Sequence, residues 1–264
     1  MKRIVWSFTC LSVLCAVTPA HAYSIFGTKW DPGANTASTL IGTPGGATFS
    51  IMGSGLDLAN GDSDHNGAGS TLPIQSLILF DPAFDYVGMM NWALDEWASV
   101  SGFTNLGVVT DGGADVGASE ANDGHLGDIR VGAWPFNPAL GVAHGFAPNT
   151  QTLFGGPAGT VGGDIHFEPY VTWDNDDFLG FGFDIRTVAL HEVGHALGLD
   201  HSDIVGSVME EGYHGVRHEL TADDIAGIQA LYGTGAAVPL PAAVWAAMPL
   251  MGALVYSRYR KRLT

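Results

Sequence analysis

The chain has 264 residues, and its 27 Asp and Glu outnumber its 10 Lys and Arg, which gives a formal net charge of −17. Six of the basic residues stand at the two ends, so the segment between them carries 4 minus 27, or −23. So large a negative charge disfavours nucleic acid and anionic membrane surfaces as partners, and it suits a soluble extracellular protein.

Residues 1–22 are predicted to be an export signal. Lys2 and Arg3 precede an apolar stretch over 4–17, and a small-x-small cleavage pattern follows at 19–22. The apolar stretch is shorter than the roughly 18 to 20 residues of a membrane span, so a retained anchor is disfavoured. We expect the mature chain to begin near residue 23.

The two cysteines, Cys10 and Cys15, both lie in the segment to be removed. The exported protein would then have neither a thiol nor a disulfide, and its stability must come from the core, the turns and bound metal. Lipid attachment at Cys15 is an alternative, but the preceding Val and Leu are not the small residues usual before such a cysteine.

Residues 237–264 are predicted to be a sorting or transmembrane tail. A Val-Pro-Leu-Pro-Ala start, an apolar run of about 17 residues and a cluster of Arg and Lys follow one another. The length is at the low end for a spanning helix, and the terminal charges fit the positive-inside rule. A buried terminal helix is the alternative. The tail also resembles the PEP-CTERM type, which implies the sorting machinery of a Gram-negative envelope, transient retention at the inner membrane, and a final location at the cell surface or outside.

The remaining segment, residues 23–236, is interpreted as one domain without internal repeats. Alternating and β-branched patterns predict strands over 46–53, 103–109, 128–134, 141–146 and 163–167. Helical spacing predicts helices over 82–100, 184–197 and 221–232. A strand, a helix, a group of strands and two further helices indicate an α+β fold.

Two of these helices have predicted N-caps. Asp81 precedes the first, and its carboxylate could accept the free N–H groups of the first turn. Thr221 precedes the last, with Asp224 three residues later as its acidic partner, as in a capping box.

The segment from His191 to His201 predicts a catalytic metal site. His191 and His195 stand four residues apart, so on a helix both imidazoles share one face and can reach one zinc ion. Glu192 lies about 100° round the helix from His191, close enough to act on a water at the metal without ligating it.

His201 is the predicted third ligand, and the helix must end before it. On a continued helix it would lie roughly 9 Å beyond His195, too far to share an ion. Gly198 stands between them and tolerates the left-handed conformation that ends helices. Three imidazoles leave a fourth position open, as catalytic zinc sites require.

These residues match the signature H-E-x-x-H-x-x-G-x-x-H, and the sequence resembles the metzincin clan of zinc proteases. Met209 matches the clan's Met-turn methionine, and Ser202 together with residues 220–233 resembles the matrixin, or matrix-metalloprotease-like, branch. The resemblance implies a small, mostly parallel, twisted sheet with an antiparallel edge strand, and three helices. It also implies an endopeptidase with Glu192 as general base and zinc as cofactor.

The resemblance further implies where a polypeptide substrate binds. An edge strand containing Val142 and Ala143 would pair with an extended chain, and Tyr213 would line a pocket that selects one side chain. The family's proline two residues after the methionine is Glu211 in this chain, so the pocket departs from the family pattern there.

His144 and His166 match two ligands of the matrixins' second, structural zinc. The other two ligands, from a His-Gly-Asp element, are missing from the shortened loop, and two histidines do not close a tetrahedral site. Histidines that are paired with each other or face solvent are the alternative.

Calcium is a candidate second metal. Residues 62–67 place oxygen donors at alternate positions, as an EF-hand loop begins, but position 12 is Pro73 rather than Glu. Asp174, Asp176 and Asp177 form another acidic cluster. Solvated turns are the alternative for both.

Three functions compete for this pattern. The first is an exported endopeptidase, expected to be a monomer, that cleaves extended polypeptides with zinc-activated water. The second is a surface-displayed metzincin scaffold that binds without turnover, which the retained Glu192 disfavours. The third is a zinc protease ligated by Glu210, Glu211 or Glu219, which the spacing from Gly198 to His201 disfavours.

Overall fold

The computed structural model describes eight stretches of the chain, namely residues 22–32, 37–57, 70–78, 81–116, 127–135, 141–148, 161–175 and 179–235. The predicted export signal, apart from Ala22, and the predicted C-terminal tail lie outside them. Within the described stretches, no helix combines the length and apolar character needed to cross a membrane.

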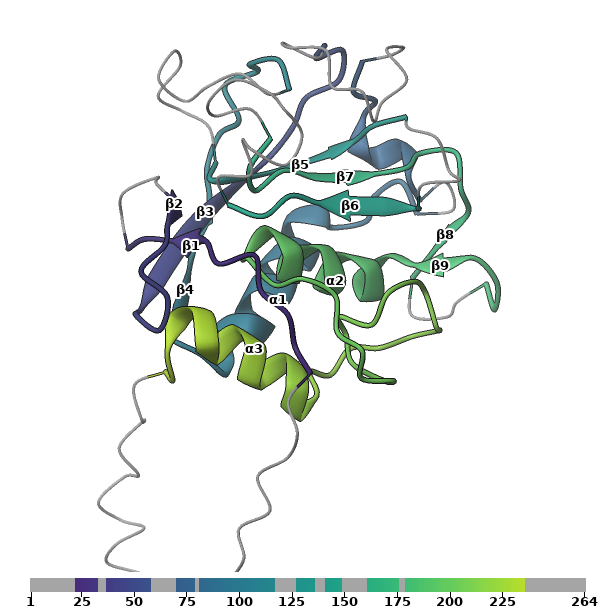
Figure 1. Ribbon diagram of the computed structural model, residues 1–264. Coiled ribbons are helices and arrows are strands. Elements are labelled where there is room, and N and C mark those ends of the chain that lie inside the picture. Colours follow the sequence, from purple (N-terminus) through teal and green to yellow (C-terminus); the bar gives the residue numbers. More distant parts are fainter. Residues whose placement is uncertain are drawn as a thin grey trace, which may run out of the picture.

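A five-stranded sheet forms the upper layer of the molecule (Figure 1). Its strands are β3 (Gly45–Ile51), β4 (Phe103–Val108), β5 (Ile129–Ala133), β6 (Ala143–Gly145) and β7 (Ile165–Phe167). They lie in the order β4-β3-β5-β7-β6, and all pairs are parallel except that of β6 with β7. The expected mostly parallel sheet with one antiparallel edge strand is therefore confirmed.

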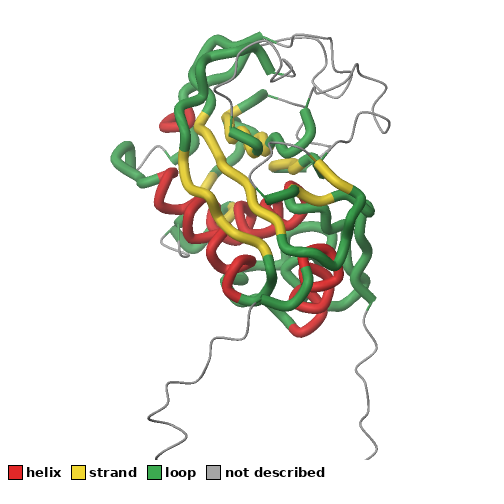
Figure 2. Tube along the Cα trace, turned by 90° about the vertical axis from the view of Figure 1, so that its left-hand side faces the viewer, coloured by secondary structure: helices red, strands yellow, loops and turns green. Residues whose placement is uncertain are grey.

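Three α-helices complete the α+β fold, as expected: α1 (Tyr86–Ser99), α2 (Ile185–Ala196) and α3 (Ala222–Tyr232). Figure 1 shows α1 and α2 beneath the sheet and α3 lower still, and the turned view in Figure 2 keeps this layering. A short 3-10 helix, η2, spans Ile74–Ser76.

Four further strands were not predicted. They form two small ladders, in which β1 (Lys29–Trp30) pairs with β2 (Ala37–Ser38) and β8 (Trp173–Asp174) pairs with β9 (Phe183–Asp184). Each strand has two residues, which is too short for an alternating pattern to be recognised in the sequence.

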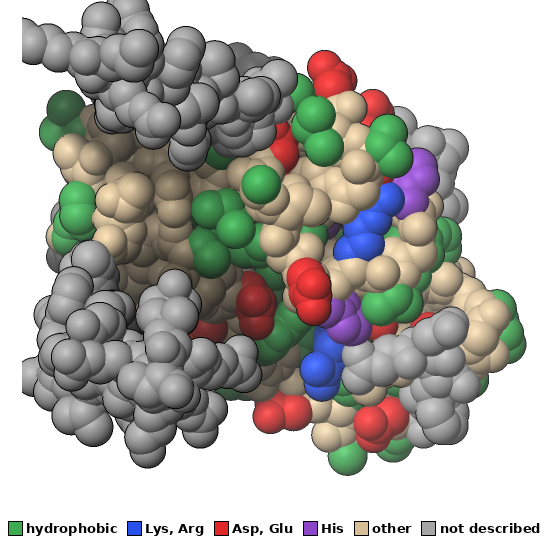
Figure 3. Space-filling model, turned by 90° about the horizontal axis from the view of Figure 1, so that it is seen from below, with side chains coloured by type: hydrophobic (Ala, Val, Ile, Leu, Met, Phe, Trp, Pro, Cys, Tyr) green, Lys and Arg blue, Asp and Glu red, His purple; other side chains and the backbone are tan. Residues whose placement is uncertain are grey.

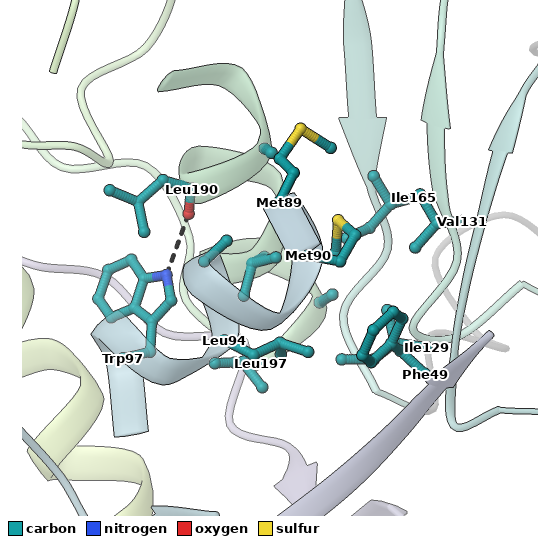
Figure 4. Close-up of a cluster of buried hydrophobic side chains, with 14 of the residues drawn as sticks. Phe49, Met89, Met90, Leu94, Trp97, Ile129, Val131, Ile165, Leu190 and Leu197 are labelled. Carbon is teal, nitrogen blue, oxygen red and sulfur yellow. Dashed lines mark hydrogen bonds between the residues drawn. The ribbon is translucent and has the colours of Figure 1, made fainter. Parts of the chain in front are cut away.

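The core lies between the sheet and the helices α1 and α2 (Figure 4). Met90 and Leu94 of α1 are fully buried, and Met90 points toward Ile165 and Val131 of the sheet. Trp97 continues the same helical face, and its indole N–H donates to the carbonyl of Leu190 on α2 at 3.0 Å. The i, i+4, i+7 spacing of these side chains explains why this segment forms an amphipathic helix.

The predicted cap of α1 was wrong. The helix begins at Tyr86 rather than Pro82, and its N-cap is Asp85, which accepts from the N–H of Gly88 at 2.8 Å. Asp81 instead accepts from the N–H of Ala83 in the preceding turn. Two carboxylates four residues apart both suit an N-cap, and the packing of the following apolar positions selects the second.

The caps of the other two helices place the site elements. Asp184 caps α2 by accepting from the N–H of Thr187 at 2.7 Å. Thr221 and Asp224 form the predicted capping box of α3.

The molecule's lower face carries acidic side chains and a few basic ones among hydrophobic and neutral groups (Figure 3).

Candidate metal centre

Helix α2 carries two of the predicted ligands and the predicted base. The rings of His191 and His195 lie one turn apart, with centroids 4.7 Å from each other. Glu192 follows on the same helix and is 5% exposed. One regular helix therefore presents two imidazoles and a carboxylate to the same space.

The chain leaves α2 through a Schellman turn that brings in the third imidazole. Gly198 donates to the carbonyl of His195 at 2.8 Å, and Leu199 donates to that of Gly194 at 2.9 Å. Gly198 has φ +108°, and a Cβ there would collide with the carbonyl oxygen of Thr28. A larger residue at this position would be strained and blocked, so glycine is required where the helix must stop.

Two backbone carbonyls fix the tautomers of the helical ligands. The Nδ1 of His191 lies 2.7 Å from the carbonyl oxygen of Val208, and that of His195 lies 2.8 Å from the carbonyl oxygen of Leu199. A carbonyl only accepts, so each Nδ1 carries the proton and each Nε2 keeps a lone pair for a metal. The carbonyl of Leu199 thus belongs both to the helix-ending turn and to the site.

The three imidazoles fit one zinc ion. A ligand nitrogen from each of His191, His195 and His201 lies within 4.8 Å of the others, and the Nε2 atoms of His195 and His201 are 3.2 Å apart. Bonds of about 2.0–2.1 Å at tetrahedral angles place neighbouring nitrogens about 3.3–3.4 Å apart, close to this spacing. Among the residues that the structure describes, this is the one cluster of three or more metal-ligating side chains that converge.

The surroundings keep the helical ligands neutral, as metal binding requires. Burial lowers the pKa of His191 to about 4, although its hydrogen bond to Val208 opposes the shift. Burial also holds the pKa of His195 well below its usual value, and the neighbouring His191 adds to this effect. Near neutral pH both side chains are therefore unprotonated at Nε2 and need no proton loss before they bind a cation.

Glu192 carries a buried carboxyl next to His191 on α2. Burial raises its pKa to about 8, and a hydrogen bond with the Gly145 backbone partly offsets the shift. Its Oε2 is buried, and within the described stretches it has no hydrogen-bond partner. A nearby dication would lower this pKa, because an opposite charge favours the carboxylate. Both influences together suit a group that takes and returns a proton near neutral pH.

Met209 lies in the core against α2, the helix that carries two of the imidazoles. It is 2% exposed, and a Cβ on Gly194 of α2 would collide with its sulfur. Its carbonyl accepts from the N–H of Ser202 at 2.8 Å, which ties it to the residue after the third ligand. These contacts join the segment after His201 to α2, and the Met-turn role of Met209 stays a prediction.

Asp224 is a supporting residue that the sequence analysis described only as a helix cap. Its carboxylate also accepts from the backbone N–H groups of Val208 at 3.0 Å and Met209 at 3.1 Å. The carbonyl of Val208 holds His191, so Asp224 orients a ligand through the backbone between them. Two adjacent acidic residues at the start of α3 were the available signal, but their target depends on tertiary packing.

A cleft of about 490 Å³ opens above the imidazoles. One side is lined by residues 141–145, from the edge strand β6 and the turn before it, and includes Val142 and Ala143. Another part of the cleft is lined by residues 211–215 and Arg217, and includes Tyr213. The structure therefore brings the predicted substrate-binding residues and the metal ligands into one cleft.

His144 and His166 face each other across the β6–β7 pairing, with Nε2 and Nδ1 2.9 Å apart. Asp164 lies 3.7 Å from the other nitrogen of His166. The described residues thus show the two histidines paired, and the second zinc stays a prediction. The calcium loop at 62–67 and two of the three Asp of the second cluster lie outside the described residues.

Three convergent imidazoles, two from helix α2 and one from the turn after it, and a buried carboxyl on the same helix define the site of a zinc metallohydrolase. A family model described as Matrixin, of peptidase family M10, matches residues 84–233. The chain therefore belongs to the matrixin family of zinc metalloendopeptidases, and zinc is the metal that the triad is built to hold.

Similar proteins come from animals and bacteria. The chain is 44% identical to matrilysin of Rattus norvegicus over 104 residues, which are 38% of this chain and 35% of the relative. It is 35% identical to interstitial collagenase of Equus caballus over 154 residues, 58% of this chain and 29% of the relative. It is 31% identical to karilysin of Tannerella forsythia over 149 residues, 56% of this chain and 29% of the relative. The chain thus spans about a third or less of the length of these relatives.

Proposed function

We propose that this chain is an exported zinc-dependent endopeptidase that hydrolyses peptide bonds of extended polypeptides. The observation that carries the proposal is the single cleft that contains the three imidazoles, the buried carboxylate of Glu192 and the edge strand β6. Family membership supports the same reaction class.

The edge strand would hold the substrate. Because β6 ends the sheet, the backbone of residues 142–145 can add an extended peptide by main-chain hydrogen bonds. Tyr213, in another part of the cleft, would contact a substrate side chain. A peptide bound in this way lies across the imidazoles, with its scissile carbonyl beside Glu192.

Glu192 would carry the proton. Zinc, when bound by the triad, supplies a Lewis acid that polarises the substrate carbonyl and makes water more acidic. Glu192 accepts the proton of the attacking water at its carboxylate and then delivers it to the nitrogen of the leaving amine. Its burial favours uptake of the proton, because burial raises the pKa of this carboxyl and makes it a stronger base than an exposed glutamate.

A metzincin scaffold that binds without turnover is the second candidate. The buried carboxyl of Glu192 argues against it, because burying a polar atom without a hydrogen-bond partner costs stability, and binding alone gives no reason to keep such a group. An assay for turnover decides between the two.

Chelation provides that assay. We expect a zinc chelator to abolish cleavage of an unstructured protein substrate and added zinc to restore it, because the three ligands belong to a metal site. Reagents against serine and thiol nucleophiles should have no effect. The measurement is the appearance of new peptide termini by mass spectrometry. Cleavage that continues in excess chelator would require a different nucleophile.

We further propose that residues 1–22 direct export and that residues 237–264 hold the domain at the inner membrane until processing. The proposal rests on the charge distribution, in which basic residues cluster at the ends and the middle is acidic. No partner beyond a polypeptide substrate and the sorting machinery is proposed.

Deleting residues 237–264 should release soluble enzyme from the cell envelope, because the apolar run and its terminal charges would no longer enter the membrane. The measurement is fractionation of cells that express the full-length and shortened forms, with mass spectrometry of the mature C-terminus. Equal soluble release of both forms, with Arg262 and Thr264 still present, would show that the tail neither anchors nor sorts.

A further inference from the structure

The metal ligands divide the cleft into two parts along α2. Thr187 and Val188 line the part that precedes His191 on the helix, whereas Phe26 and Asp200 line the part beyond the helix end. The segment 211–217, called the 211–217 wall below, faces the first part. The following contacts explain this placement.

Asp184 connects the 211–217 wall, and His218 directly after it, to the start of α2. Its backbone N–H donates to the hydroxyl of Tyr213 at 3.1 Å, and its Oδ1 lies 2.8 Å from the Nε2 of His218. The N–H of Arg217 donates to the Thr187 hydroxyl at 2.8 Å, and that hydroxyl donates to the same Oδ1 at 2.7 Å. The same Oδ1 of Asp184, a residue that is 1% exposed, thus accepts the capping hydrogen bond of α2 and contacts the imidazole of His218. The contact between Asp184 and His218 is called the latch below.

Ring contacts fix the orientation of the two aromatic members. The imidazole of His218 stands edge-on to Trp92 of α1 at 5.4 Å between centroids. Tyr213 stands edge-on to Phe183 of β9 at 5.2 Å. Both contacts are of the geometry that aromatic pairs prefer, so each ring meets Asp184 from a defined direction.

The wall has no regular secondary structure, although the Arg217 guanidinium also donates to the carbonyl of Ser207 at 2.6 Å and pairs with Glu210 at 2.7 Å. Residues 211–217 form neither helix nor strand, and Gly212 and Gly215 hold left-handed backbone with φ of 84° and 96°. Glu211 and His214 are exposed. The shape of this side of the cleft therefore depends on side-chain contacts, and those at Asp184 and Thr187 are the ones that join it to α2.

We propose that Asp184 and His218 are positioning residues that hold the 211–217 wall against α2, and so determine which substrate side chain the cleft accepts beside the metal. The inference rests on the proposed endopeptidase function. Asp184 precedes His191 by seven residues, roughly 10 Å along the helix, so it acts through Tyr213 and Arg217 rather than on the metal. Loss of the latch should change substrate selection and KM, and should leave zinc binding and kcat nearly unchanged.

His218→Ala is the decisive variant, because it removes the latch and leaves Asp184 in place as the cap of α2. His218→Gln is the conservative variant, since its amide can still donate to Asp184. Gln229→Ala is the matched control: Gln229 is also half-buried and donates to a backbone carbonyl, that of Val100 at 2.7 Å, but it lies on α3 and does not line the cleft.

Two peptides are compared that differ at one position beside the scissile bond, where one has Leu and the other has Ala. The position chosen is the one at which the wild type discriminates most strongly between these two residues. In His218→Ala we expect KM for the Leu peptide to rise about five- to tenfold with kcat within about twofold, as when a hydrogen bond that supports binding is lost. The ratio of kcat/KM between the peptides should fall accordingly. His218→Gln should restore it to within about twofold, and Gln229→Ala should match the wild type. A general loss of protein stability would lower kcat/KM for both peptides equally and leave the ratio between them unchanged.

Amide hydrogen exchange of the zinc-loaded protein tests the latch without turnover. Residues 211–217 should exchange at least about fivefold faster in His218→Ala than in the wild type or Gln229→Ala. Equal exchange rates, or an unchanged kcat/KM ratio in His218→Ala, would overturn the proposal. A wild type that cleaves no peptide would instead contradict the proposed function, and the exchange rates would still decide the latch.

Discussion

Glu192→Gln should lower kcat by about 10²- to 10⁴-fold while zinc still binds at the triad, because the proton acceptor is lost and the three imidazoles remain. Gln has nearly the shape of Glu and fills the same buried site, so the fold should not change. Neutral Gln also places no charge in a site where burial already raises the pKa of the carboxyl to about 8. The measurement is kcat on a peptide substrate, with zinc content determined on the same sample.

The matched control is Glu219→Gln, the same chemical change at an exposed position that does not line the cleft. It should cleave at the wild-type rate. The zinc content of Glu219→Gln also tests Glu219 as a ligand, and the same substitution at Glu210 and at Glu211 tests the other two glutamates of that alternative. Full activity of Glu192→Gln would contradict the mechanism proposed above.

His201→Ala should lower zinc affinity by more than about 100-fold and activity with it. Substitution of residues that only support metal ligands already lowers metal affinity or activity about 10- to 100-fold, and this variant removes a ligand itself. His201 is exposed at the rim of the cleft, so its truncation leaves no cavity in the core and the domain should still fold.

The measurement for His201→Ala is zinc content after dialysis against buffered zinc, with circular dichroism as the check on folding. Retention of tight, stoichiometric zinc by the folded variant would mean that His201 is not a ligand. The structure predicts otherwise, because the Nε2 of His201 lies 3.2 Å from that of His195.

The sequence predicted those parts of the site that depend on local spacing. The interval from His191 to His195 sets two imidazoles on one helical face, and Gly198 ends the helix whatever packs around it. The capping box of Thr221 and Asp224 is likewise a short-range pattern. Each of these predictions uses geometry within about ten residues, which the backbone alone determines.

Features that join distant parts of the chain could not be predicted. Asp224 reaches Val208 only after α3 packs near the metal centre, and His218 reaches Asp184 across 34 residues. The choice of Asp85 over Asp81 as the cap of α1 was missed for a similar reason, because the packing of the helix decides it. Such contacts depend on tertiary structure, and the residue types alone do not specify their partners.

The pairing of His144 with His166 depends on strand register. A resemblance predicted them to be ligands of a second zinc, and the β6–β7 pairing places them directly opposite each other. A shift of one residue would turn one of them to the other face of the sheet. The contact between them is therefore a property of the assembled sheet.

Zinc titration of metal-free protein tests the central claim most directly. Peptide hydrolysis should be absent without metal, rise in proportion to added zinc and saturate at one equivalent bound by His191, His195 and His201. Zinc that binds elsewhere, at His144 and His166 for example, should leave kcat unchanged. Hydrolysis at the full rate by protein shown to contain no metal would contradict the account.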